Sequence, residues 1–200
     1  MKTSKRFINH YKNGYMPWHH EKVDYNLVRM VEKWPVPIGK VLELGCGTGT
    51  DAIWLAEKGF DVTAVDVSDI AIGIAKESAK KAGVTCNLLT VDFVRDGLDY
   101  GEFDFIFDRG YFHSYKTGPK RKIFARKVMA QLKSKGLWLS LIGSCDSPPR
   151  DEGPPMHSAK EIVTAVEPYF EILILKASRF GSDMKEPAKN WVCLMQKRDS

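Results

Sequence analysis

The stretch VLELGCGTGTDA, residues 41–52, decides the fold class that the sequence predicts. Its first half is an apolar run ending in an acid, as in a buried strand, and its second half places three glycines in five residues before a helix-like segment. Gly45, Gly47 and Gly49 allow a sharp turn and let the backbone approach a ligand closely. The loop opens a helix whose first N–H groups favour a carboxylate or a phosphate. The stretch therefore predicts a strand–loop–helix unit that binds a ligand.

Strand-like and helix-like segments alternate along the rest of the chain. We expect strands at 40–44, 61–66, 85–92, 103–108, 137–143, 170–176 and 190–197, and helices at 21–34, 50–59, 68–83, 119–136 and 158–169. Ser68 and Gly83 are the expected caps of the helix at 68–83. This alternation predicts an α/β fold with a doubly wound, mostly parallel, seven-stranded sheet and helices on both faces. Because the last two strands follow each other without a helix, the final strand is expected to be antiparallel.

The predicted helix 119–136 concentrates positive charge. Pro119 is expected to open it and Gly136 to close it. Its apolar stripe is expected to face the core, with the bases on the opposite face; the stripe consists of Ile123, Phe124, Val128, Met129 and Leu132. From Arg109 to Cys145 the sequence has nine bases and no acid. This run is either a solvated helix face, which we favour, or a surface that attracts an anionic partner.

Composition is that of an ordinary soluble globular protein, with 44% hydrophobic and 28% charged residues and a net charge of +5. A length of 200 residues fits one domain. The four cysteines are scattered without a CxxC pair, which indicates neither a disulfide framework nor a metal site and suggests a reducing, cytoplasmic location. No apolar run has the length of a membrane span or of a signal-peptide core. We expect no membrane partner, no metal, and a monomer or weak homodimer.

Acidic residues close three successive predicted strands. Glu43, just before the glycines, would attract a cationic amino group and repel a pyrophosphate. Asp66 closes the second strand and can accept both hydroxyls of a ribose. Asp92 closes the third strand and can accept an adenine amino proton, with Phe93 against the ring. A dinucleotide motif would have a third glycine where Thr50 stands. The inferred ligand has an amino acid end, a ribose and an adenine but needs no phosphate, and S-adenosylmethionine satisfies all three requirements.

The segments VLELGCGTGTDA, VTAVDVSDIAI, VDF and FDFIFDRG, in this order and spacing, resemble the successive motifs of class I S-adenosylmethionine-dependent methyltransferases. The resemblance spans residues 40–142 and implies a Rossmann-like fold, transfer of a methyl group, and S-adenosylhomocysteine as the product of the cofactor. Cys46 is expected to be a small filler of the loop rather than a nucleophile. The cofactor-binding residues that the resemblance implies are Glu43, Gly45, Cys46, Gly47, Gly49, Thr50, Asp51, Asp66, Val67, Ser68, Ile70, Asp92, Phe93, Asp108 and Arg109.

A second resemblance concerns the segment NGYMPWHHEKVD, residues 13–24, and the segment DRGYFHSY, residues 108–115. Both are similar to patterns in the small-molecule methyltransferases of the thiopurine, halide/thiol and tellurite-resistance type. In that group the Pro-Trp segment folds over the cofactor. The resemblance therefore implies a helical lid at residues 1–39, with Trp18 over the cofactor, and a methyltransferase domain at residues 40–200.

The same resemblance assigns further side chains. Tyr11 and Tyr15 would lie near the lid tryptophan, and Asp108 and Arg109 beside the methionine moiety of the cofactor. The residues that would face the acceptor are Tyr111, His113 and Tyr115. His19 and His20 depart from the small, glycine-containing run expected after the tryptophan, so no lid contact is assigned to them.

The chemistry of methyl transfer limits what the site must provide. Displacement at a sulfonium needs the nucleophile held in line with the methyl group. A thiol with a pKa of about 8.5 is partly ionised at neutral pH and needs little help, so we favour a small-molecule acceptor with sulfur or a similarly soft nucleophile. His113 is the best candidate base, since imidazole is mostly neutral at pH 7, with Tyr111 beside it. Arg109, Arg150 and Arg179 are candidates for a basic rim that attracts an anionic acceptor.

Other functions remain open at this point. A methyltransferase for RNA or protein could dock through the basic helix 119–135, and a cofactor-binding module without transfer activity would share the glycine loop. An NAD-dependent oxidoreductase is disfavoured by Thr50. The fourth strand lacks the (D/N)PPY motif of exocyclic amine methylation, and nucleic acid is not the expected partner. The proline-rich stretch 144–158 is either part of the acceptor site or an ordinary surface connection.

Overall fold

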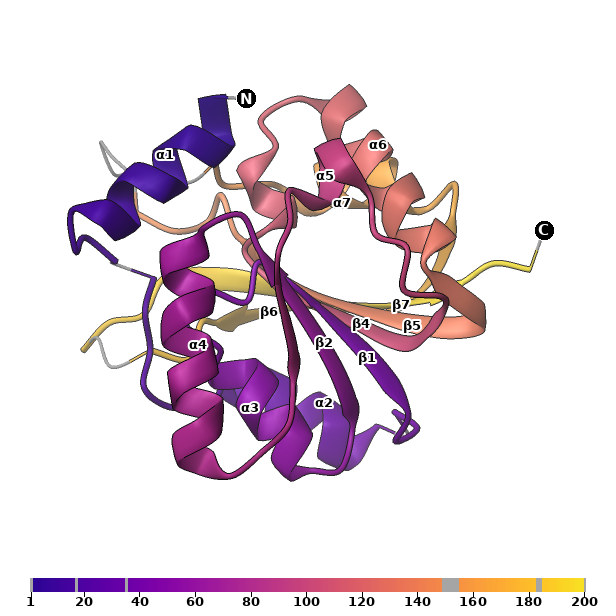
Figure 1. Ribbon diagram of the computed structural model, residues 1–200. Helices are drawn as coiled ribbons and strands as arrows, with labels where there is room; N and C mark the ends of the chain where they lie inside the picture. The colour runs from indigo at the N-terminus through magenta and orange to yellow at the C-terminus, as the bar shows by residue number, and fades with distance from the viewer. Residues whose placement is uncertain (1, 17, 35, 149–154, 183–184, 200) are drawn as a thin grey trace.

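A computed structural model describes residues 2–16, 18–34, 36–148, 155–182 and 185–199. Its centre is a seven-stranded sheet in the order β3-β2-β1-β4-β5-β7-β6 (Figure 1). The strands are β1 (Lys40–Leu44), β2 (Asp61–Asp66), β3 (Asn87–Thr90), β4 (Phe103–Arg109), β5 (Leu132–Gly143), β6 (Phe170–Arg179) and β7 (Lys189–Lys197). Neighbouring strands among β1–β5 are parallel, and β7 is antiparallel to both β5 and β6. The predicted Rossmann-like sheet with an antiparallel last strand is confirmed.

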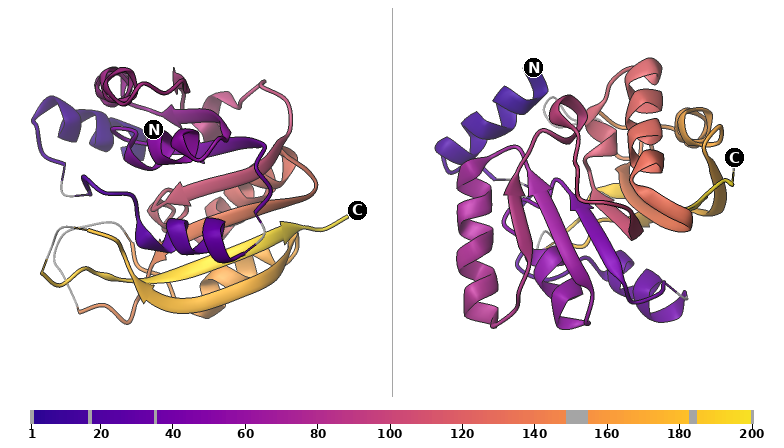
Figure 2. Two further views of the ribbon diagram at one scale, coloured as in Figure 1. Left: turned by 90° about the horizontal axis from the view of Figure 1, so that it is seen from below. Right: turned by 45° about the vertical axis from the view of Figure 1, so that its right-hand side comes forward.

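Helices cover both faces of this sheet (Figures 1 and 2). They are α1 (Lys2–Lys12), α2 (Tyr25–Lys33), α3 (Thr50–Glu57), α4 (Asp69–Ala82), α5 (Phe93–Asp96), α6 (Gly118–Ala130) and α7 (Ala159–Val166), with a 3₁₀ turn at Phe112–Ser114. Leu27 of α2 and Leu55 of α3 belong to one core, and Phe124 of α6 and Ile162 of α7 belong to the other. Helix α1 packs against α4. None of the helices in the described ranges is long and apolar enough to cross a membrane.

The alternation of side chains along β1 decides which face of the sheet Glu43 occupies near the carboxyl end of this strand. Val41 points into the core under α2, α3 and α4, whereas Leu42 and Leu44 point into the core under α5, α6 and α7. Glu43 therefore shares the face of Val41. The strand order reverses between β1 and β4, and ligands of doubly wound sheets bind at such a reversal, beyond the carboxyl ends of the strands. Glu43 and the glycine loop lie at that point.

The ends of α4 follow the sequence prediction. The Ser68 hydroxyl accepts a hydrogen bond from the N–H of Ala71 at 3.3 Å, and Gly83 ends the helix with φ of 70°. Helix α2 begins at Tyr25, later than predicted, because the Asp24 carboxylate caps it by accepting the N–H of Asn26. A side chain that can bond its own helix start defines the boundary more sharply than apolar spacing does.

The predicted helix 119–136 is too long. Helix α6 ends at Ala130, and Leu132 already pairs with Phe103 as the first residue of β5. Lys133 and Lys135 consequently lie in β5 and not on the helix. Leu132 continues the apolar spacing of α6, so the pattern of the sequence extends past the point where bonding to β4 takes over the backbone.

Two side chains of α6 also differ from the predicted faces. Ile123 is 44% exposed, and Arg121, one of the bases, is only 4% exposed. The guanidinium of Arg121 donates to the carbonyls of Tyr115 and Lys116 and pairs with Glu161 at 3.0 Å. These partners come from the segment before α6 and from α7, so the spacing within the helix could not indicate them.

Candidate functional site

The glycine loop has the backbone that its composition predicts. Gly45, Gly47 and Gly49 have φ of 73°, 55° and 87°, values that other residues rarely adopt. The N–H groups of Gly45 and Cys46 both donate to the Val65 carbonyl, at 2.8 and 3.0 Å, which ties the loop to β2. A Cβ on Gly49 would lie 2.9 Å from the Cβ of Ala75, so this glycine allows α3 and α4 to approach each other.

Cys46 is buried inside this loop. Burial, together with the charges of Glu43 and Asp66, raises the pKa of its thiol well above the ordinary value. A thiol in this environment stays protonated and is a poor nucleophile. The geometry agrees with the expected role of a small filler.

Asp66 ends β2 beside the glycine loop. One carboxylate oxygen accepts the N–H of Gly47 at 3.1 Å, and the other accepts the N–H of Ser68 at 2.9 Å. Burial raises the pKa of Asp66, and these backbone hydrogen bonds act in the opposite direction. Its carboxylate is thereby held in a fixed orientation, as expected for a group that reads a ribose.

Glu43 is the buried acid of the site, and only 2% of it is exposed. Among the described residues, its Oε2 atom has no hydrogen-bond partner. Burial and the nearby Asp51 and Asp66 raise the pKa of Glu43, while Arg109 and a backbone bond from Ala52 lower it. A cationic ammonium would supply the missing partner, so the residues present fit the amino end of S-adenosylmethionine.

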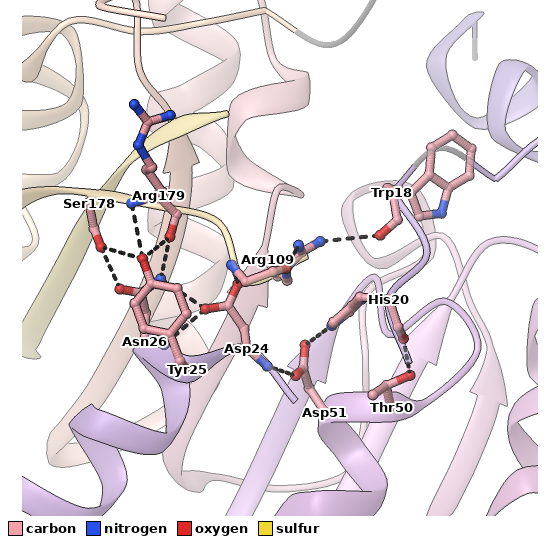
Figure 3. A network of polar contacts seen from close by, with 11 residues as sticks. Trp18, His20, Asp24, Tyr25, Asn26, Thr50, Asp51, Arg109, Ser178 and Arg179 are labelled. Atoms are coloured by element: carbon pink, nitrogen blue, oxygen red, sulfur yellow. Dashed lines mark hydrogen bonds and ion pairs between the residues drawn. The ribbon is translucent and has the colours of Figure 1, made fainter. Parts of the chain in front are cut away.

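Residues 18–24, here called the strap, cross over the glycine loop. The Nδ1 atom of His19 lies 3.0 Å from the Thr48 hydroxyl, and the Thr50 hydroxyl donates to the His20 carbonyl at 2.9 Å. His20 Nε2 lies 3.1 Å from Asp51 Oδ2 (Figure 3). The two histidines to which the sequence assigned no contact therefore attach the strap to the glycine loop and to the start of α3.

Asp51 and Asp24 extend this attachment. The other oxygen of Asp51 accepts the N–H of Asp24 at 2.9 Å, so both of its carboxylate oxygens are bonded to the strap. Asp51 was expected to bind the cofactor directly. In the structure its carboxylate orients His20 and the strap backbone (Figure 3).

Arg109, at the end of β4, is occupied on three nitrogens. Its Nε donates to Asp24 Oδ2 at 3.0 Å, one terminal nitrogen donates to the Trp18 carbonyl at 3.3 Å, and the other donates to the Gly181 carbonyl at 2.6 Å. Its guanidinium also lies over the ring of Phe180, 5.0 Å from the centroid. The expectation that Arg109 forms a free basic rim gives way to a structural role, because its charge is balanced by a buried carboxylate.

The predicted lid aromatics meet above the loop. Trp18 Nε1 donates to the Tyr11 hydroxyl at 3.1 Å, and the Trp18 ring makes edge contacts with Phe7, His10 and Tyr11. The Tyr11 hydroxyl would lie 3.0 Å from a Cβ on Gly47, and burial together with the charge of Asp66 raises the pKa of Tyr11. Helix α1 and the strap therefore cover the approach to the glycine loop.

A pocket remains between the strap, the glycine loop and β4. Its lining residues are Tyr11, Met16, Trp18, His19, His20, Glu43, Gly45, Cys46, Gly47, Thr48, Thr50, Asp51 and Arg109. The structure thus brings Trp18, separated in sequence from the glycine motif, onto the same pocket. Eight of the sixteen predicted cofactor residues belong to this lining. The eight that do not are Gly49, Asp66, Val67, Ser68, Ile70, Asp92, Phe93 and Asp108.

The loop after β4 departs from expectation at Asp108. This carboxylate is fully buried and accepts the N–H groups of Tyr111 and Phe112, at 3.0 and 2.9 Å, and Trp138 Nε1 at 2.9 Å. Burial raises the pKa of Asp108 to about 6. Asp108 was expected to stand beside the methionine moiety, but it shapes the following turn because its side chain points into the core under α6.

The candidate catalytic residues of this turn are placed differently from one another. Tyr111 packs on the glycine loop, since a Cβ on Gly45 would lie 3.6 Å from Tyr111 Cβ, and burial raises the pKa of its hydroxyl. His113 is buried and accepts the Gly143 N–H on Nδ1 at 2.9 Å. The neutral ring of His113 therefore carries its proton on Nε2, where a general base would need a lone pair. This geometry does not support the predicted role of His113 as a base.

Four more predicted cofactor residues are spread around this centre. Asp92 caps α5 by accepting the N–H of Arg95, and Val67 is half-buried. Ile70 is 36% exposed on the first turn of α4. Phe93 was expected to lie against an adenine ring, but it is 1% exposed and packs edge-on against Phe124 inside the core. Phe93 is the first residue of the short helix α5, and its ring joins the core that also contains Phe124 of α6.

Arg179, which was predicted to belong to a basic rim, makes a structural contact instead. Arg179 donates to the Pro187 carbonyl at 2.7 Å in the loop between β6 and β7. Arg150 and the centre of the proline-rich stretch, residues 149–154, lie outside the described residues.

The sequence analysis also missed Asp24 and Gly181, which face each other so closely that a Cβ on Gly181 would lie 2.9 Å from Asp24 Cα. The available signal in the sequence was Asp24 itself, an acid six residues after Trp18 in the segment at 13–24.

Comparison with known proteins adds to this geometry. The family model described as thiopurine S-methyltransferase (TPMT) matches residues 2–197. The chain is 29% identical over 165 residues to "Probable thiol methyltransferase 2" of Arabidopsis thaliana, covering 80% of this chain and 68% of that protein. It is 27% identical over 157 residues to "2-heptyl-1-hydroxyquinolin-4(1H)-one methyltransferase" of Mycobacteroides abscessus, covering 78% of this chain and 69% of that protein.

A solved structure reported under "Conversion of a Disulfide Bond into a Thioacetal Group during Echinomycin Biosynthesis" aligns with a TM-score of 0.84. The alignment has 23% identity and covers 98% of this chain and 91% of the other. At this identity the likeness shows that the two chains share a fold.

Proposed function

The chain belongs to the thiopurine S-methyltransferase family and is a class I S-adenosylmethionine-dependent methyltransferase, and we propose that it methylates a small molecule at sulfur or a similarly soft nucleophile. S-adenosylmethionine supplies an activated methyl group and becomes S-adenosylhomocysteine. The residues of the chain then have to bind the cofactor, exclude water and hold the acceptor in line.

Four residues would hold the cofactor in this proposal. Glu43 would bind the ammonium, supported by its unpartnered, buried Oε2. Asp66 would accept the ribose hydroxyls, supported by its fixed position beside Gly47. Asp92 would accept the adenine amino group from the N-cap of α5, just beyond the end of β3. Trp18 would cover the cofactor from the strap, supported by its place in the pocket lining.

The single observation that carries the choice of a small acceptor is the attachment of the strap. A hydrogen bond between His19 and Thr48, one from Thr50 to the His20 carbonyl, and one from Arg109 to the Trp18 carbonyl tie the strap to residues that line the pocket. An acceptor must reach the methyl group beneath this cover. A small molecule can do so without displacing the strap, whereas a folded macromolecule cannot.

A sulfur nucleophile is supported by the state of the candidate base. The Gly143 N–H occupies the lone pair of His113 Nδ1, so this ring is arranged to donate rather than to accept a proton. A thiol needs little assistance, because a pKa of about 8.5 leaves a share of thiolate at neutral pH. The thiolate would form its bond to the methyl carbon as the bond from that carbon to the sulfonium breaks, and the thiol proton would leave to solvent.

Two measurements test this function. Calorimetry measures the binding of S-adenosylhomocysteine, and an enzyme assay measures the formation of the homocysteine product from S-adenosylmethionine with thiols, halides, thiopurines or bulk RNA as the acceptor. We expect binding together with turnover on at least one thiol. Binding without turnover on any small acceptor would contradict the proposal. Turnover on RNA with a steep dependence on salt would favour the macromolecular alternative, for which the exposed Lys120, Lys122 and Arg126 of α6 would be the docking face.

A further inference from the structure

The pocket has to accommodate two opposite charges. The methionine end of the cofactor carries an ammonium and a carboxylate, and Glu43 offers a partner to the ammonium alone. Asp51 lines the pocket as well, so the carboxylate of the cofactor would enter a region that already holds two acids, Glu43 and Asp51. The carboxylate of the cofactor therefore needs a positively charged donor. The candidates in the lining are Arg109, His19 and His20.

Arg109 is the candidate with its charge already balanced. Its Nε is bound to the fully buried Asp24, and its two terminal nitrogens donate to the carbonyls of Trp18 and Gly181. Turning the guanidinium toward a ligand would leave Asp24 unpaired in the interior, which is costly. The arginine therefore does not supply the missing donor.

The two histidines differ in how they are held. His19 uses Nδ1 in its contact with the Thr48 hydroxyl, and this contact is exposed to solvent. The side chain of His20 is 13% exposed, and its Nε2 faces the buried carboxylate of Asp51 at 3.1 Å. In the described part of the chain, Nδ1 of His20 has no hydrogen-bond partner. His20 thus combines a ring that is held by Asp51 (Figure 3) with a second nitrogen that is available to a ligand.

We propose that His20 binds the carboxylate of the cofactor's methionine end, and that Asp51 is the positioning residue that holds its ring. Both nitrogens of His20 then carry a proton, and one carboxylate lies on each side of the imidazolium. The first N–H groups of α3, which begins at Thr50, add to the favourable field for an anion at this end of the pocket. The inference rests on the cofactor and is independent of the proposed acceptor.

Calorimetry with two ligands that differ only in this carboxylate tests the inference. S-adenosylmethionine and decarboxylated S-adenosylmethionine share the ammonium, the ribose and the adenine. We expect the unaltered protein to prefer S-adenosylmethionine on the order of tenfold to a hundredfold, the scale of a hydrogen bond to a charged group. The variant His20→Gln should lose most of this preference by weakening S-adenosylmethionine alone, and the matched variant His19→Gln should retain the preference.

Three outcomes would overturn the inference. Equal weakening of both ligands in His20→Gln would show that His20 merely anchors the strap. No preference in the unaltered protein would show that no residue of the pocket recognises the carboxylate of the cofactor. A preference lost in His19→Gln instead would assign that carboxylate to His19. Failure of both ligands to bind the unaltered protein would remove the cofactor assignment itself, a result distinct from the others. If His20→Gln does not fold, His20→Asn gives the same test, since it also removes the positively charged donor.

Discussion

Arg109 Nε lies 3.0 Å from Asp24 Oδ2, and this ion pair joins the end of β4 to the strap. The same Asp24 oxygen accepts the Gly181 N–H at 2.7 Å, while Arg109 donates to the Gly181 carbonyl at 2.6 Å. The pair therefore connects the strap, the central sheet and the segment after β6 at one point. Because Asp24 is fully buried, the loss of either partner would leave a charge without compensation.

Asp24→Asn should lower the free energy of unfolding by about 3 kcal/mol, because Arg109 would lose its buried counter-charge. It should also weaken S-adenosylhomocysteine binding, since the strap would lose its attachment to β4. Urea unfolding and calorimetry measure the two effects. Glu167→Gln is the matched control, because its pair with Arg198 is about half exposed and should contribute less than about 1 kcal/mol. Equal losses in both variants would contradict the importance of the buried pair.

Asp66→Ala should weaken cofactor binding by about 2–3 kcal/mol, since two ribose hydroxyls would lose their acceptor. Calorimetry with S-adenosylhomocysteine measures the change. Asp61→Ala is the control, because Asp61 begins the same strand at its opposite, exposed end and should leave the affinity unchanged. An unaltered affinity in Asp66→Ala would remove this carboxylate from the ribose.

Trp18→Ala should weaken cofactor binding less than Asp66→Ala, because it removes a cover and not an ionic acceptor. Trp18→Phe separates the two contributions of the side chain. It keeps an aromatic ring but lacks the donor that bonds the Tyr11 hydroxyl, and we expect an intermediate affinity. Full affinity in Trp18→Ala, measured by calorimetry, would show that the strap is not a lid over the cofactor.

Glu43→Gln should change the pH dependence of stability. Burial raises the pKa of the Glu43 carboxyl, so the folded chain binds its proton more tightly than the unfolded chain does. The contribution of Glu43 to stability is therefore present at low pH and declines as pH rises from the unfolded pKa, about 4.3, through the raised value. Above that range the variant should gain stability relative to the unaltered protein while losing cofactor affinity. Unfolding free energies measured from pH 5 to 9 check the first effect, and parallel curves for the two proteins would contradict it.

The fold was largely predictable from local patterns. The strand–glycine–helix unit, the Ser68 and Gly83 caps and the antiparallel last strand each depend on residues that are close in sequence. The errors arose where a local pattern continued past a tertiary boundary. Leu132 fits the stripe of α6 but pairs with Phe103, and Arg121 fits the polar face of the helix but is buried by Glu161 and two carbonyls.

The candidate site was predictable in part for a related reason. The residues of the glycine loop lie together because they are consecutive, and Glu43 joins them through the alternation of one strand. Asp108 and Phe93 were misassigned, since both belong to motif positions whose side chains turn into the core here. His113 was misjudged because the Gly143 N–H that sets its tautomer comes from β5.

By itself, the sequence determined the sheet, the glycine loop and the kind of ligand, because periodicity, capping and the conformational freedom of glycine act between neighbours in the chain. Only the tertiary structure decided which charged side chains are paired within the protein and which are available to a ligand. Arg109 is paired with a residue 85 positions away, and His20 meets Asp51 across 31 positions. The energy of a charge depends on what surrounds it in space, so its role follows from packing that no local pattern records.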